Sequence, residues 1–129
     1  MNLESKAEQL ITKLLRETYE GAIQWHATDA PKPLTLATDD AFPLFLSTNY
    51  KGIDVGLYQK RSKYIFDPPH WCWTEKIGLC VYRKGDLGGI FADAVIWQYE
   101  ENLSSLNNLF SAAREQASGI DSILDGLLK

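Results

Sequence analysis

Cysteine, histidine and long apolar runs are scarce in this chain. Its 129 residues include two cysteines and two histidines, with no CxxC pair and no apolar run near the roughly 20 residues that cross a bilayer. The first residues, MNLESKAEQL, are polar and amphipathic and do not resemble a secretory signal. We therefore expect a soluble, cytoplasmic protein with free thiols, no disulfide framework and no membrane association.

An excess of positive charge is also lacking. The formal net charge is -4 and the pI is near 5.1, so the chain as a whole repels phosphate backbones. The one dense basic run is QKRSKY at 59–64, which is more typical of a solvated or edge-protecting strand than of a nucleic-acid patch. We expect no nucleic-acid partner.

The composition is that of one folded domain. A hydrophobic fraction of 45% and a charged fraction of 23% are ordinary for globular proteins, and this length suits one core without metals or disulfides. No repeat or linker divides the sequence, which predicts a single domain over residues 1–129.

The first segment has helical periodicity. Asn2 is placed to cap its first turn and Gly21 to end it. The apolar residues recur at spacings of three and four, at Leu3, Ala7, Leu10 and Leu14. This pattern predicts an amphipathic helix.

The middle of the chain alternates with a period of two, which is typical of strands. NYKG contains the turn-forming Asn and Gly of a hairpin, and the Gly-rich KGDLGG connects a second one. One strand face carries Ile53, Val55 and Leu57, and another carries Ile77, Leu79 and Val81. The expected strands begin at Ile23 and Trp25 and continue through 43–48, 52–60, 71–83 and 90–99.

The last segment predicts one long helix. Glu100 and Glu101 suit its positive N-terminal end, and Asn102 is a candidate cap. Apolar residues at heptad spacing would extend it over about 37 Å, at Leu103, Leu106, Phe110, Ala113, Ala117, Ile120, Leu124 and Leu127. This seam packs on the protein's own first helix or sheet, or alternatively on a second copy in a homodimer; its broad second apolar stripe favours the first.

Together these elements predict an α+β fold. It comprises an N-terminal helix, an antiparallel sheet of four to five strands and a long C-terminal helix, with both helices on one sheet face.

The spacing of the cysteines and histidines argues against a metal site and against catalysis. Cys72 and Cys80 lie eight positions apart on one expected strand, roughly 26 Å, which is too far for a shared metal. His70 and Cys72 alone supply too few ligands, and their pairing is unspecific for a catalytic thiol. We predict no catalytic residue, no metal site and no cofactor.

The stretch FDPPHWCW at 66–73 holds the candidate partner-binding residues. Pro68 and Pro69 stiffen the connection between two strands. Core packing is one interpretation of the aromatic row, and an aromatic anchor at a protein interface is the other. The candidates are Phe66, His70, Trp71 and Trp73.

A different set of residues suggests a ligand pocket between sheet and helices. Apolar pockets with few polar groups are typical small-molecule sites. The candidates are Trp25, His26, Tyr58 and Trp97, with Trp73 as a further lining residue.

Three stretches carry a loose resemblance: LLRETYEGAIQW, STNYKGIDVGLY and LFSAAREQASGIDSILDGLL. They resemble small uncharacterised bacterial α+β proteins with a helix, a short antiparallel sheet and a C-terminal helix. The resemblance implies the same architecture, and no functional residues come with it.

The leading functional hypothesis is a non-enzymatic protein–protein interaction or regulatory module, comparable to immunity, chaperone or adaptor proteins in size and charge only. A small-molecule binding protein is the alternative.

Overall fold

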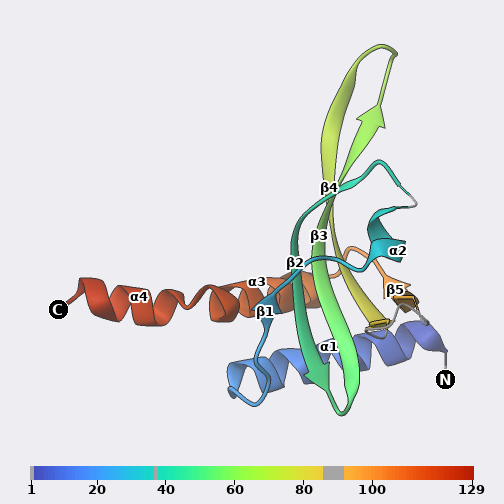
Figure 1. Cartoon of the computed structure of the whole chain (residues 1–129). Coiled ribbons are helices and arrows are strands. Elements are labelled where there is room, and N and C mark those ends of the chain that lie inside the picture. Colours follow the sequence, from blue (N-terminus) through green and yellow to red (C-terminus); the bar gives the residue numbers. More distant parts are fainter. Residues whose placement is uncertain (1, 37, 86–91) are drawn as a thin grey trace.

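The computed structural model describes residues 2–36, 38–85 and 92–129, which form an α+β fold (Figure 1). In chain order the elements are α1 (Leu3–Tyr19), β1 (His26–Ala27), α2 (Lys32–Thr35), β2 (Ala41–Tyr50), β3 (Ile53–Ile65), β4 (Trp71–Arg83), β5 (Ala94–Tyr99), α3 (Ser104–Ser118) and α4 (Ile120–Leu127). The predicted fold class is confirmed.

The sheet has five antiparallel strands in the order β1-β2-β3-β4-β5. Every strand therefore pairs with its neighbour in sequence. The β2–β3 turn lies at Lys51 and Gly52, which both have positive φ (54° and 82°), as a two-residue turn matched to strand twist requires. The second predicted turn, KGDLGG, lies mostly outside the described residues.

Helix α1 begins and ends where the sequence predicts. The Asn2 side chain accepts a hydrogen bond from the Ser5 N–H (2.8 Å), and Gly21 follows the helix with φ 77°. Ala7, Ile11 and Leu14 are buried against the sheet and α3. Helices α1 and α3 cover one sheet face, as predicted (Figure 1).

The segment between α1 and β1 is held to α3 by Gln116. Its Oε1 accepts the Trp25 N–H (2.7 Å) and its Nε2 donates to the Ile23 carbonyl (2.6 Å). Ile23 and Trp25 are buried, as their alternation predicts, but the strand itself comprises only His26–Ala27.

The opposite sheet face is also covered. Tyr58 and Cys80 are fully buried there, in a cluster that also contains Leu34 of α2, Phe45 and Tyr82. Gly78 lies opposite Tyr58 in the β3–β4 pairing, and a Cβ at position 78 would lie 2.1 Å from the Tyr58 ring. The glycine therefore makes room for the tyrosine ring against the strand.

The predicted single C-terminal helix is wrong. The helix breaks at Gly119, which has a left-handed φ of 67°, and α4 beyond it has no buried residue. Glycine adopts this conformation at little cost, so the apolar spacing continues across residue 119 although the helix is interrupted there. In Figure 1, α4 extends away from the sheet.

The start of this region also differs from the prediction. The residue that caps α3 is Leu103, not Asn102, and no acidic residue lies in the first turn. Glu100 bonds to β3 instead. No helix among the described residues is long and apolar enough to cross a membrane.

Candidate functional site

The β3–β4 hairpin extends beyond its neighbours in the sheet. Pairing with β2 ends at Arg61 and pairing with β5 ends at Leu79, whereas β3 and β4 pair with each other as far as Ile65 and Trp71. We call residues 62–77 the projecting hairpin; Figure 1 shows it rising away from both helices. All of its residues except the half-buried Ser62 and Ile77 are exposed.

The tip of the projecting hairpin is tightly closed. The Phe66 N–H donates to the His70 carbonyl and the His70 N–H to the Asp67 carbonyl, both at 3.1 Å. The His70 Nδ1 is also 2.9 Å from the Asp67 carbonyl. Asp67 has φ 43°, and the Pro68–Pro69 bond is cis. These contacts fix the direction in which Phe66 and His70 point.

Aromatic side chains occupy both faces of the projecting hairpin. On one face the Trp71 and Trp73 rings are edge to face, with centroids 5.5 Å apart. The Lys63 Nζ lies 4.7 Å from the Trp71 centroid, a cation–π geometry. On the other face Phe66 stacks between Tyr64 and His70, with centroids 6.3 Å away on each side.

The four predicted partner-binding residues all lie at the outer end of the projecting hairpin and are exposed, as two pairs on opposite faces. Trp71, Trp73 and Phe66 keep 48%, 50% and 45% of their surface accessible, and His70 is exposed as well. Core packing, one of the two interpretations of this row, is therefore wrong. Clustered exposed aromatics are typical of binding surfaces.

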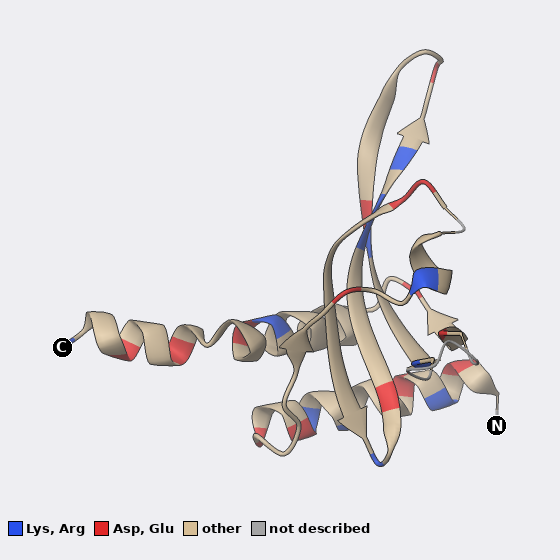
Figure 2. Ribbon diagram, in the orientation of Figure 1, with Lys and Arg blue, Asp and Glu red and all other residues tan. Residues whose placement is uncertain are grey.

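The basic run at 59–64 does not form an open cationic patch. Lys60 pairs with Glu100 at 2.6 Å and Arg61 with Glu75 at 2.7 Å, while Lys63 lies over the indoles. Figure 2 shows basic and acidic residues interspersed over the ribbon. Lys60, Arg61 and Lys63 are therefore each engaged by another side chain of the protein.

The ligand-pocket candidates are not brought together. Trp25 is buried on the helix side, where its Nε1 donates to the Thr18 Oγ1 (3.0 Å), whereas Tyr58 is buried on the opposite sheet face. His26 is exposed on the edge strand. Trp97 lines an apolar depression of about 390 Å³ beside α1, and none of the other candidates lines it. Trp73 lies on the projecting hairpin.

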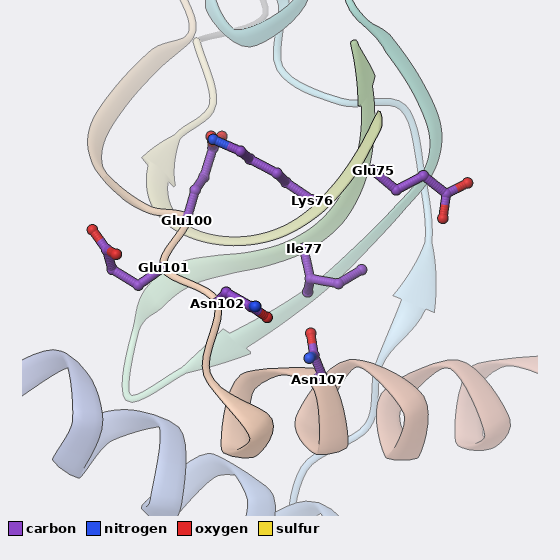
Figure 3. Close-up of a pocket in the computed structure, with 7 residues that line it drawn as sticks. All are labelled: Glu75, Lys76, Ile77, Glu100, Glu101, Asn102 and Asn107. Atoms are coloured by element: carbon purple, nitrogen blue, oxygen red, sulfur yellow. The ribbon is translucent and has the colours of Figure 1, made fainter. Parts of the chain in front are cut away.

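A polar cavity of about 410 Å³ lies at the base of the projecting hairpin (Figure 3). There the chain leaves β5 and turns toward α3, so the wall combines β4 with the β5–α3 connection. The cavity is lined by Glu75, Lys76, Ile77, Glu100, Glu101, Asn102 and Asn107.

Glu100, on this wall, is tied to the sheet. Its carboxylate accepts hydrogen bonds from the Tyr58 hydroxyl and from Lys60, and Gln98 donates to the Tyr58 hydroxyl (3.2 Å). Burial, followed by the bond to Glu100, raises the pKa of Tyr58 above its ordinary value. Sequence reasoning missed this cluster, because the only signal was the position of Glu100 at the end of an alternating strand.

The cysteines and histidines do not form a metal centre. Cys72 is exposed and Cys80 is buried, and no group of three or more Cys, His, Asp or Glu side chains within the described ranges could hold a metal ion.

Comparisons with protein-family models, with curated proteins and with solved structures found no match to this chain.

Proposed function

We propose that this protein is a non-enzymatic protein-recognition module whose contact surface is the projecting hairpin. The observation that carries the proposal is the exposure of Trp71 and Trp73, held in mutual contact on a strand pair that extends out of the fold. Tryptophan supplies more binding energy at protein interfaces than most residue types.

The two indoles leave apolar surface in water, which is unfavourable for the isolated protein and supports a role in binding. Each half-exposed indole leaves roughly 100 Å² in water, and burial of apolar surface is worth about 25 cal/mol per Å². A packed core would have removed this surface from water during folding. A partner protein can gain that free energy when it covers the pair.

The tip makes the surface preorganised. The hydrogen bonds between Phe66, Asp67 and His70 hold the turn in one conformation, so less conformational entropy is lost when a partner binds. A cytoplasmic location is part of the proposal.

The test is affinity capture from the native host lysate. We expect the Trp71→Ala, Trp73→Ala double variant to lose a captured protein, with affinity reduced at least about tenfold. Tyr19→Ala is the matched control, because Tyr19 is an exposed aromatic residue on α1, away from the hairpin.

Circular dichroism and thermal unfolding verify that each variant folds. Equal capture by wild type and the double variant would contradict the proposal, as would equal loss in the Tyr19 control.

A further inference from the structure

One edge of β4 is unpaired along the projecting hairpin. Residues 71–77 pair with β3 on one side, whereas β5 pairs only with Leu79 and beyond. The Phe66–His70 hydrogen bond sets the alternation, so residues 72, 74 and 76 bond toward β3. Trp71, Trp73, Glu75 and Ile77 therefore direct their N–H and C=O groups to the free edge.

We propose that this edge pairs antiparallel with the same edge of a second copy, forming a two-fold symmetric dimer with one continuous sheet. The inference rests on the proposed function, because it names a partner for the projecting hairpin. Unpaired strand edges are templates for such strand addition. The outward N–H and C=O groups belong to odd-numbered residues. Self-pairing therefore requires only that odd-numbered residues of one copy lie opposite odd-numbered residues of the other.

Space and charge select the register. An axis at Glu75 would place two carboxylates opposite each other, which is unfavourable. An axis at residue 74 would bring the hairpin tip of the second copy against Tyr99, which already occupies the position opposite Leu79. An axis at Trp73 avoids both conflicts and, among the registers that do, pairs the longest stretch of the free edge.

In that register Trp73 faces Trp73 of the second copy, and Trp71 faces Glu75. Aromatic pairs directly opposite on neighbouring strands stabilise sheets. The four indoles expose roughly 400 Å² together, and the paired strands and tips add area toward the roughly 1,000 Å² that a specific interface needs.

The polar cavity at the hairpin base receives the tip of the second copy. Residues 68–70 of that copy come level with residues 76–78, where Ile77 lines the cavity (Figure 3). Within the described residues, the side chains of Glu101, Asn102 and Asn107 on its wall make no hydrogen bond or ion pair. The carboxylate of Glu101 can accept a hydrogen bond from an imidazole N–H of His70.

A cysteine at position 74 tests the register. Cys72 lies opposite Thr74 of the second copy at a Cα separation of about 4.5 Å, within disulfide range. Two Cys72 residues are roughly 8 Å apart on the diagonal, too far to bridge. Mild oxidation should therefore give a covalent dimer with Thr74→Cys, but not with wild type or with the Cys72→Ser, Thr74→Cys variant.

The backbone of the free edge is tested by sedimentation over a range of concentrations. Glu75→Pro removes an outward N–H and should weaken dimerisation at least about tenfold. Glu75→Gln is the matched control: it also lacks the ion pair with Arg61 but keeps the N–H, and it should dimerise like wild type.

Absence of the covalent dimer, or a covalent dimer that persists without Cys72, overturns the inference, as does equal dimerisation of the two Glu75 variants. If wild type is a monomer and captures a different protein that the Trp71→Ala, Trp73→Ala variant does not capture, self-pairing is overturned and the recognition role stands. A monomer whose double variant captures as well as wild type overturns both.

Discussion

At the scale of residues, the two cysteines of β4 differ in solvent exposure, because one end of the strand extends beyond the covered part of the fold. Cys72 and Cys80 lie an even number of positions apart on β4 and point to the same sheet face. That face is covered at Cys80 by the cluster around Phe45 and Tyr82 and is open at Cys72. Burial raises the pKa of Cys80 to about 12.

Thiol labelling checks this difference. Near neutral pH we expect a disulfide reagent to modify one thiol in the native protein and two in denaturant, since the thiolate is the reactive form. A Cys72→Ser variant should then show no rapid reaction. Rapid labelling of both native thiols would contradict the burial of Cys80.

The same pKa shift makes a pH prediction. The neutral thiol of Cys80 is favoured in the folded state, so its contribution to stability is complete below the ordinary pKa of 9.0 and is lost as pH rises toward about 12. The free energy of unfolding of a Cys80→Ala variant, measured against wild type, should fall less steeply over that interval.

At the scale of elements, α3 and α4 have different roles despite one apolar periodicity. Leu106, Leu109 and Phe110 of α3 are buried in the core, whereas no residue of α4 is. Helix α4 therefore adds little to the stability of the fold.

Truncation tests this division. Removal of residues 120–129 should change the free energy of unfolding by less than about 1 kcal/mol. Leu109→Ala should cost about 2–5 kcal/mol, because it leaves a cavity in the core. Urea unfolding compares them, and a truncation as costly as Leu109→Ala would place α4 in the core.

At the scale of the whole molecule, the structure is a two-sided core with two extensions. The central strands are buried on both faces, between α1 and α3 on one side and the α2 cluster on the other. The projecting hairpin and α4 both extend from this body (Figure 1).

Amide hydrogen exchange rates, measured on dilute protein, should be slow in the core and fast in the two extensions. The slowest exchange is expected at Leu57 and Leu79, which are fully buried on paired strands, and the fastest within α4 and at the outward N–H groups of residues 71–77. Protection of α4 equal to that of β3 would contradict this prediction.

The first helix, the alternation of the strands, the NYKG turn and the position of Cys72 and Cys80 on one strand could all be predicted from the sequence. These are local properties: capping, periodicity and reach along an extended chain act over a few residues. Alternation also placed Trp71 and Trp73 on one face, and the aromatic cluster at FDPPHWCW marked the candidate surface.

The exposure of this face, in contrast, depends on the tertiary structure. Whether a strand residue is buried depends on which distant element covers it, and β2 and β5 end before they reach the tryptophans. The same cause separated Trp25 from Tyr58, since a pocket needs residues on one side of the sheet. It also left α4 uncovered, because apolar spacing records which residues share a face and not whether anything packs against it.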